Sequence, residues 1–367
     1  MRLWVGTRKG AFRFERQAGT WRVADVAFLG DPVNLVSVDP RDGAVYAALD
    51  LGHYGSKLHR STDGGKSFEE LAMPAFPPMP EGEDGLDAQG REVPWNVQAI
   101  WALSPGHASQ PGRLWAGTIP GGLFRSDDGG QSWQLNEALW NMPERKQWFG
   151  GGSDYPALHS VLVHPEHPER VLVGISCGGA WLSEDDGASW SVRAHGMRAD
   201  FLPPDQAGNP ITQDPHCIVQ CAAQPEVLWT QHHCGIFRST DGGAQWKELS
   251  GVPVSAFGFP VAVHPRDPDT AWFVPAVKDS QRVPVDARVV VTRTRDGGES
   301  FDVLTEGLPS EHAYDIVYRH ALDVDASGDC LAFGSTTGSL WFSDDQGDRW
   351  ATLGTHLPPI YSVCFAG

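Results

Sequence analysis

The chain has 367 residues, 41% of them hydrophobic and 20% charged, and a formal net charge of −18. An acidic surface repels phosphate backbones and anionic lipids, which argues against nucleic acid and membranes as partners. No stretch approaches the roughly 18 apolar residues of a membrane-spanning helix, and the opening MRLWVGTRKGAF has no signal-peptide core. With no export signal and no Cys-x-x-Cys pair among six cysteines, we expect reduced thiols in a cytoplasmic protein.

The predicted elements are short strands from one end of the chain to the other. Three strand-like runs come first, MRLWVG, GAFRF and TWRVADV, and one more, PIYSVCFAG, comes last. Six units lie between them, at 33–71, 95–136, 157–194, 215–250, 256–305 and 313–353. In most units two apolar runs flank an x-Pro turn, and two further runs flank an Asp-Gly turn. Four antiparallel strands in about 50 residues are typical of one β-propeller blade.

The Asp-Gly turn follows a pattern, Ser/Thr-x-Asp-x-Gly-x-x-aromatic, that occurs six times. The copies are STDGGKSF at 61, SDDGGQSW at 126, SEDDGASW at 183, STDGGAQW at 239, TRDGGESF at 294 and SDDQGDRW at 343. The Asp can accept backbone hydrogen bonds across the turn, the Gly can adopt positive φ, and the ring can fold over the turn. Each residue type has a structural role, so Asp63, Asp128 and Asp241 are predicted not to be catalytic.

The terminal runs complete the repeat. One strand from the end of the chain and three from its start make a seventh blade, whose turn ERQAGTW lacks the Asp. Joining them closes the ring and removes exposed sheet edges. The sequence therefore predicts an all-β, seven-bladed β-propeller that forms a single domain over residues 1–367.

The six boxes resemble the Asp-box, or bacterial neuraminidase repeat (BNR), of the sialidase-like propeller superfamily. That superfamily includes sialidases, xyloglucan-cleaving glycosidases, sortilin-type receptors and a photosystem II assembly propeller. The resemblance covers essentially the whole chain and is nearest to uncharacterised bacterial proteins described as sialidase or glycosyl hydrolase. It implies the fold, and it leaves enzyme, receptor and assembly factor open as functions.

The long insertions are predicted to share one face. In such propellers the first strand of a blade lines the channel, so x-Pro and Asp-Gly turns lie at the bottom. The insertions 72–94, 137–156, 195–214 and 275–287 then fall at the top. Insertions on one face of a repeat array mark its binding side.

Histidines at the top ends of neighbouring blades form the candidate metal site. His159, His216 and His233 can converge on the channel mouth and hold Zn²⁺ or another first-row divalent metal. The same imidazoles suit acid–base catalysis. The alternative is that they are strand-end histidines bonded to neighbouring loops, since no His-Glu-x-x-His motif is present.

The sialidase resemblance implies three arginines, a Tyr–Glu pair and an acidic residue, and this chain matches that set poorly. It lacks Arg-Ile-Pro and has Thr7-Arg8-Lys9 in its place. We expect Arg8 and Arg319 to bind an anion, and Arg282 is a further candidate. Tyr314 with Asp315, together with His53, forms the catalytic hypothesis. A two-carboxylate glycosidase remains open, with candidates Asp50, Asp154, Asp214, Asp279 and Asp315.

Aromatic residues in and beside the insertions include Trp95 and Trp148, which suit stacking on a sugar-like ligand. The alternative is an apolar cluster that orders the loops. Cys217 and Cys234 follow histidines and suit either a nucleophile or a buried strand position. The resulting hypothesis is a cytoplasmic hydrolase for a small polar or sugar-like ligand, true sialidase activity being unexpected. The alternative is a non-catalytic propeller that binds a partner protein.

Overall fold

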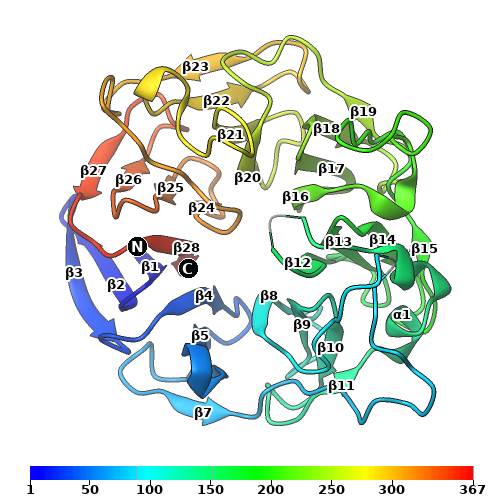
Figure 1. Ribbon diagram of the computed structural model, residues 1–367. Coiled ribbons are helices and arrows are strands. Elements are labelled where there is room, and N and C mark those ends of the chain that lie inside the picture. Colours follow the sequence, from blue (N-terminus) through cyan, green and yellow to red (C-terminus); the bar gives the residue numbers. More distant parts are fainter. Residues whose placement is uncertain (88, 152, 367) are drawn as a thin grey trace.

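The computed structural model describes residues 1–367 except 88, 152 and 367. Seven four-stranded antiparallel sheets stand around a central channel (Figure 1). We number the blades in chain order from the blade that contains both termini. This arrangement confirms the predicted seven-bladed, all-β propeller. Within the described residues, no helix is long and apolar enough to cross a membrane.

The strands of each blade are given from the channel outward. Blade 1 contains β28 (Ile360–Ala366), β1 (Arg2–Thr7), β2 (Gly10–Gln17) and β3 (Thr20–Ala27). Blade 2 contains β4 (Val33–Val38), β5 (Val45–Asp50), β6 (Ser56–Ser61) and β7 (Glu69–Leu71). Blade 3 contains β8 (Ala99–Pro105), β9 (Leu114–Ile119), β10 (Leu123–Ser126) and β11 (Gln134–Leu135). Blade 4 contains β12 (Ala157–Val163), β13 (Val171–Ser176), β14 (Gly179–Ser183) and β15 (Ser191–Val192).

The second half of the ring repeats the same order. Blade 5 contains β16 (Pro215–Cys221), β17 (Gln224–His232), β18 (Gly235–Ser239) and β19 (Lys247–Glu248). Blade 6 contains β20 (Gly258–Val263), β21 (Ala271–Pro275), β22 (Val291–Thr294) and β23 (Asp302–Leu304). Blade 7 contains β24 (Leu322–Val324), β25 (Leu331–Gly334), β26 (Leu340–Ser343) and β27 (Ala351–Gly354). Blade 7 differs from prediction because its first strand begins at Leu322, and residues 313–321 form an irregular segment.

Second strands form the core because neighbouring blades cover both of their faces. All six residues of β9 and of β13 are buried, and their sequences LWAGTI and VLVGIS are continuously apolar or small. The outermost β3 is by contrast mostly exposed or half-buried. The apolar core therefore lies between blades.

Each Asp box is a hydrogen-bonded turn, as the turn chemistry predicts. In the box that begins at Ser126, the Ser126 hydroxyl donates to Asp128 Oδ1 over 2.8 Å and accepts from the Gly130 N–H at 2.9 Å. Asp128 Oδ1 also accepts from the Ser132 N–H at 2.9 Å. The same network recurs in the other five boxes, which explains the repeat by local structure.

The box tryptophans reach further than their own turns. Trp133 Nε1 donates to Ala72 O at 3.0 Å, and Trp246 Nε1 donates to Arg193 O at 2.7 Å. Trp190 Nε1 donates to Asn136 Oδ1 at 3.0 Å. In each case the acceptor belongs to the preceding blade, so these rings join neighbouring blades. The expectation that the ring only covers its own turn is therefore incomplete.

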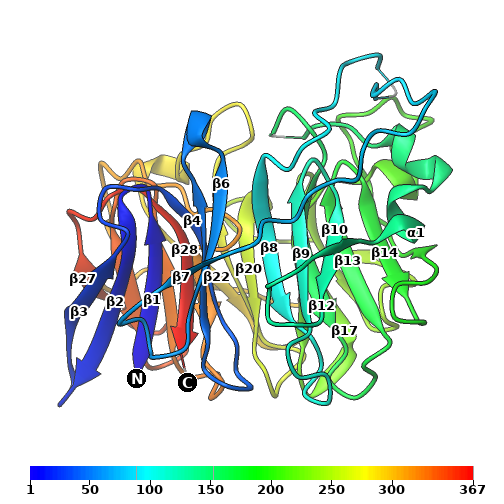
Figure 2. The same cartoon turned by 90° about the horizontal axis from the view of Figure 1, so that it is seen from below.

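The elaborated connections gather at one rim. Figure 2 shows long links and the tip of blade 2 above the sheets, and both termini below them. The short helices also lie in the connections: η1 (Gly52–Tyr54), α1 (Glu137–Trp140), η2 (Pro143–Gln147), η3 (Pro210–Thr212) and η4 (Val285–Ala287). We call this rim the top face.

Candidate functional site

A cavity of about 290 Å³ opens at the top end of the channel. We call it the mouth cavity. Its lining residues are Asn34, Leu35, Asp50, Ile100, Trp101, Arg282, Tyr318, Arg319, His320 and Tyr361. They come from the top ends of inner strands and of β5, from the 276–290 loop and from the 313–321 segment. His320 pairs with Ser362 of β28 in a parallel bridge, which holds that segment against the channel.

Arg319 is the principal charged group of the mouth cavity. Its guanidinium lies 5.9 Å from the centroid of Trp101 and 5.5 Å from that of Phe259. Nη2 donates to Ser176 Oγ at 3.2 Å. Within the described residues Arg319 forms no ion pair, and its Nε has no hydrogen-bond partner. Burial lowers the pKa of Arg319, and the charge of Asp214 opposes this effect. Such a guanidinium can bind an anion without first breaking an ion pair.

The other charges at the mouth are partly neutralised. The guanidinium of Arg282 also lies over Phe259, 5.3 Å from its centroid, and it pairs with Asp279 Oδ1 at 2.5 Å. Asp50 is the carboxylate that lines the cavity, and its Oδ1 accepts from the Gly52 N–H at 3.1 Å. The cavity thus combines two cations, one carboxylate and three aromatic rings.

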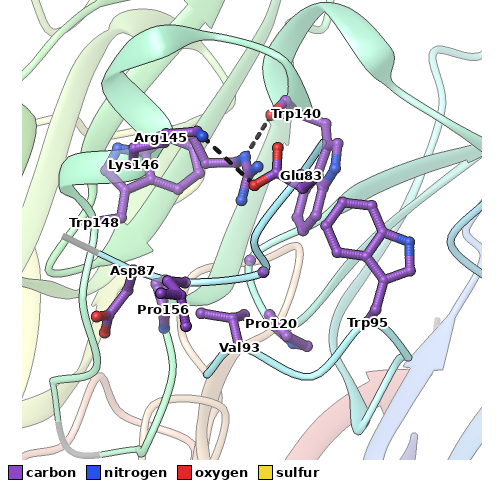
Figure 3. Close-up of a pocket in the computed structure, with 13 residues that line it drawn as sticks. Glu83, Asp87, Val93, Trp95, Pro120, Trp140, Arg145, Lys146, Trp148 and Pro156 are labelled. Carbon is purple, nitrogen blue, oxygen red and sulfur yellow. Dashed lines mark hydrogen bonds and ion pairs between the residues drawn. The ribbon is translucent and has the colours of Figure 1, made fainter. Parts of the chain in front are cut away.

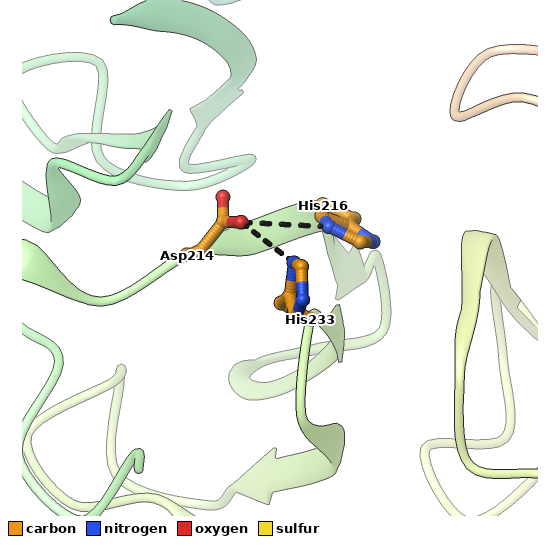
Figure 4. A group of neighbouring side chains, drawn as sticks. All are labelled: Asp214, His216 and His233. Carbon is orange, nitrogen blue, oxygen red and sulfur yellow. Dashed lines mark hydrogen bonds and ion pairs between the residues drawn. The ribbon is translucent and has the colours of Figure 1, made fainter. Parts of the chain in front are cut away.

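A carboxylate and two imidazoles meet at the top of blade 5. Asp214 precedes β16, His216 lies on that strand, and His233 directly follows β17 (Figure 4). Asp214 Oδ2 lies 3.6 Å from His216 Nε2 and 3.1 Å from His233 Nδ1. Burial acts to raise the pKa of Asp214, but the neighbouring imidazoles of His216 and His233 outweigh it and hold the pKa well below its usual value. Burial also lowers the pKa of His216, against the pull of Asp214.

The predicted histidine trio is therefore only partly assembled. His216 and His233 lie together, whereas His159 is not a member of this group. His159 is buried on β12, and its Nδ1 lies 2.9 Å from Ser160 Oγ. Asp214 is the third member of the group, because the link that precedes β16 places its carboxylate between the two imidazole rings.

The predicted catalytic residues lie in different surroundings. Tyr314 is 60% exposed, whereas its neighbour Asp315 is buried and accepts a bond from Ser335 Oγ at 2.6 Å. These two side chains do not form the expected acid–phenol pair, because consecutive residues of this segment face solvent and interior in turn. His53 is exposed in η1, where its ring lies 3.9 Å from that of Tyr54. None of the three lines the mouth cavity.

Some of the predicted ligand-binding residues line the mouth cavity, and others do not. Arg319 lines the mouth cavity, as do Arg282 and Asp50 from the wider candidate sets. Arg8 is exposed and is not among the lining residues, although its charge opposes the burial that raises the pKa of the lining Tyr361.

Trp95 and Trp148 lie in a separate place, beside a cavity of about 20 Å³ between two insertions (Figure 3). Trp148 is 1% exposed and packs on Trp181, so the structure contradicts its predicted role as an open stacking surface. Trp95 contacts Phe76 and Trp140, with centroids 6.1 and 5.6 Å away. A space this small holds a water molecule and no sugar. The rings therefore hold the insertions together, which was the alternative interpretation.

The surroundings of the candidate cysteine nucleophiles favour the protonated thiol. Burial raises the pKa of Cys217 to about 11 and also raises that of Cys234. Thiols of raised pKa remain protonated near neutral pH and are inert. The buried-strand interpretation of Cys217 holds.

Besides the aliphatic Leu35 and Ile100, sequence reasoning missed four polar or aromatic lining residues: Asn34, Trp101, Tyr318 and Tyr361. Asn34, Trp101 and Tyr361 lie second or third in inner strands, so counting from each predicted strand start would have found them. Tyr318 had no such signal, because a strand was expected where the chain is irregular.

Comparison with known proteins agrees with this architecture. Residues 124–135 match the family described as BNR/Asp-box repeat. A probable oligoxyloglucan-reducing end-specific xyloglucanase of Neosartorya fischeri is 24% identical over 386 residues, covering 95% of this chain and 43% of that protein. The GH74 xyloglucanase structure from Xanthomonas campestris superimposes with a TM-score of 0.63 at 19% identity, covering 95% of this chain and 52% of that one. YCF48 bound to D1 peptide gives a TM-score of 0.54 at 14% identity, covering 91% and 88%.

The repeats and the fold together define the chain as a seven-bladed β-propeller with BNR/Asp-box repeats. It spans less than half the length of the xyloglucanase from Neosartorya fischeri that it matches.

Proposed function

We propose that the protein is a hydrolase that acts on a small, anionic, sugar-like molecule in the mouth cavity. The observation that carries this proposal is the Arg319 guanidinium, which lies among aromatic rings at the mouth cavity and forms no ion pair with any described residue. Arg319 and Arg282 would bind a carboxylate or phosphate, and Trp101, Tyr318 and Tyr361 would pack on the ring. A volume of about 290 Å³ is close to the lower end of ligand pockets, which favours a mono- or disaccharide over a polymer.

Similarity to a xyloglucanase supports hydrolysis of a glycosidic bond as the reaction class. Such hydrolysis normally needs a general acid and a second carboxylate or base. Asp50 is our candidate for proton transfer because it lines the cavity. His320, also in the lining, is a candidate base, since burial lowers its pKa to about 4 and keeps the ring neutral.

Paired chromogenic glycosides test the proposal. We expect a 4-nitrophenyl glucuronide or sialoside to bind at least about tenfold more tightly than the neutral glucoside, because a charged hydrogen bond is worth about 1.5–3 kcal/mol. Arg319→Ala should abolish this preference, whereas Asp50→Asn should keep binding and lose turnover. Arg349→Ala is the matched control, since Arg349 pairs with Glu306 in a box on the opposite face. Equal binding of charged and neutral glycosides, unchanged in Arg319→Ala, would contradict the proposal.

A non-catalytic interaction propeller is the second candidate. The observation in its favour is the superposition with YCF48, which covers 91% of this chain and 88% of that one, so the two chains are of similar size. The mouth cavity would then bind an acidic side chain or terminal carboxylate of a partner protein. Saturable binding of such a peptide, with no turnover of any glycoside, would replace the hydrolase proposal. A cytoplasmic location and the exclusion of nucleic-acid and membrane partners remain predictions.

A further inference from the structure

We infer that Asp214, His216 and His233 form a binding site for one first-row divalent metal ion, with Zn²⁺ as its test ligand. The inference goes beyond the proposed hydrolysis and does not depend on it. The site lies next to the mouth cavity: the His216 ring stacks on Phe259, with centroids 4.7 Å apart, and Arg319 lies over that same phenylalanine. Five observations carry the inference.

The tautomer of His216 is decided by its neighbour. His216 Nδ1 lies 2.7 Å from the carbonyl oxygen of Gly258, which can only accept a hydrogen bond. Nδ1 therefore carries the proton, and the lone pair of the neutral ring is on Nε2. That Nε2 lies 3.6 Å from Asp214 Oδ2, which also bears lone pairs. A cation between these two buried acceptors, either a metal ion or a proton on Nε2, satisfies both of them.

Two of the three distances between the donor atoms suit a tetrahedral ion, and all three atoms lie within 4.8 Å of one another. With metal–ligand bonds of about 2.0–2.2 Å, neighbouring ligands of a tetrahedral Zn²⁺ lie about 3.3 Å apart. The two edges from Asp214 Oδ2 measure 3.1 Å to His233 Nδ1 and 3.6 Å to His216 Nε2. The contact with His233 alone would be an ordinary hydrogen bond. The 3.6 Å contact between His216 Nε2 and Asp214 Oδ2, which is close to the separation of ligands on a tetrahedral Zn²⁺, is what indicates a metal.

Outer contacts hold the ligands in place, as in known metal sites. The bond from His216 to Gly258 orients one imidazole, since metal-bound histidines commonly donate their other N–H to a carbonyl. Asp214 Oδ1 accepts from the Cys177 N–H at 3.1 Å.

The ligand group is least buried on the His233 side. The side chains of Asp214 and His216 are 1% and 3% exposed, whereas that of His233 is 25% exposed. Phe201, from the 195–214 insertion, lies against His233 with ring centroids 4.9 Å apart. Three protein ligands with one open position are typical of sites that bind water or substrate on the metal.

Two nearby histidines are not members of this ligand group. His232, next to His233, accepts the Asp214 backbone N–H on Nε2 at 3.0 Å, so it holds the backbone and not the metal. His159 is bonded to Ser160. The charge set is therefore two neutral imidazoles and one carboxylate, which suits Zn²⁺, Fe²⁺ or Mn²⁺.

Metal analysis of untagged protein tests the inference. We expect about one ion per chain after Zn²⁺ is added to chelator-treated protein and excess is removed. Separate titrations with Fe²⁺ and Mn²⁺ rank the ions, and Co²⁺ should give the strong visible bands of a four-coordinate site. His216→Ala and His233→Ala should lose stoichiometric binding, and Asp214→Asn should weaken it at least about tenfold.

His167→Ala is the matched control, because His167 lies in a turn at the bottom face beside Glu169 and should bind Zn²⁺ like the wild type. Should a site variant fail to fold, nitrogen NMR of the wild type still decides, since Zn²⁺ must shift His216 Nε2 and His233 Nδ1. Less than about a tenth of an ion per chain, or binding unchanged in both histidine variants, would overturn the inference.

Discussion

Some single residues at the channel mouth are buried without an oppositely charged partner, and this burial shifts their pKa. His320 is the clearest case among the described residues, because burial lowers its pKa to about 4 and its Nε2 lies 3.0 Å from His159 O. Its ordinary pKa in an unfolded chain is about 6.5. Between these two values the unfolded state binds a proton that the folded state does not bind. The stability that depends on neutral His320 is therefore lost as pH falls from about 6.5 to about 4.

His320→Gln should make the protein less sensitive to acid. Glutamine can still donate to His159 O but has no proton equilibrium in this range. Between pH 7.5 and 4.5 the wild type should lose on the order of 2–3 kcal/mol more unfolding free energy than the variant. Urea unfolding at the two pH values measures this difference. His53→Gln, at an exposed histidine, is the control; equal pH dependence of wild type and His320→Gln would contradict the assignment.

At the scale of elements, the Asp box is a turn in which the Ser and Asp side chains, and not backbone carbonyls, accept the hydrogen bonds of backbone N–H groups. Bonds from Ser132 outweigh burial and lower the pKa of Asp128 to about 2. The six boxes and the unit boundaries were predictable because each network closes within about eight residues. The inner strand of blade 7 was predicted too early in the chain. The apolar run at 313–321 forms no strand, and its last residues line the mouth cavity.

Asp128→Ala should lower the free energy of unfolding by about 1–2 kcal/mol, because it removes the acceptor of bonds from Ser132 and Ser126. Ligand binding at the mouth cavity should be unchanged, since the box lies at the opposite face. Guanidinium unfolding and calorimetric binding measure the two effects. Gln131→Ala, at an exposed position of the same box, serves as the control. If Asp128→Ala bound the ligand more weakly but kept the free energy of unfolding of the wild type, the boxes would have a functional role.

Trp246 joins blades 4 and 5, so its ring and its N–H can be tested separately. Trp246→Phe should cost about 1–3 kcal/mol, because the Arg193 carbonyl then lacks its donor. Trp246→Ala should cost about 3–5 kcal/mol through the additional cavity. Trp21→Phe is the control for the N–H, since Trp21 Nε1 has no hydrogen-bond partner among the described residues. Equal costs for Trp246→Phe and Trp21→Phe would contradict the inter-blade role.

For the whole molecule, the strand that closes the ring is decisive. β28 pairs with β1 over residues such as Leu3↔Phe365 and Val5↔Val363. Val363 and Ile360 also belong to the largest buried cluster of the protein. Without β28, an edge of β1 and an apolar seam between blades 7 and 1 would open to water.

Deletion of residues 360–367 should therefore abolish cooperative unfolding and cause aggregation. A circular permutant that joins the present ends and opens between Gly82 and Glu83 keeps β28 paired, so it should unfold like the wild type. Light scattering and thermal unfolding followed by circular dichroism compare the two proteins. A deletion variant that remained monomeric with unchanged melting would show that closure does not stabilise the ring.

The sequence by itself determined the seven blades, their closure by the termini and the face that carries the insertions. These features depend on turn chemistry and strand periodicity, which act over about eight residues and repeat along the chain. Only the tertiary structure decided which side chains share a site. Arg319 bonds to Ser176 from 143 positions away, and Asp214 reaches His233 from 19. Contacts of this kind depend on how far each blade turns around the ring, and no local pattern records that rotation.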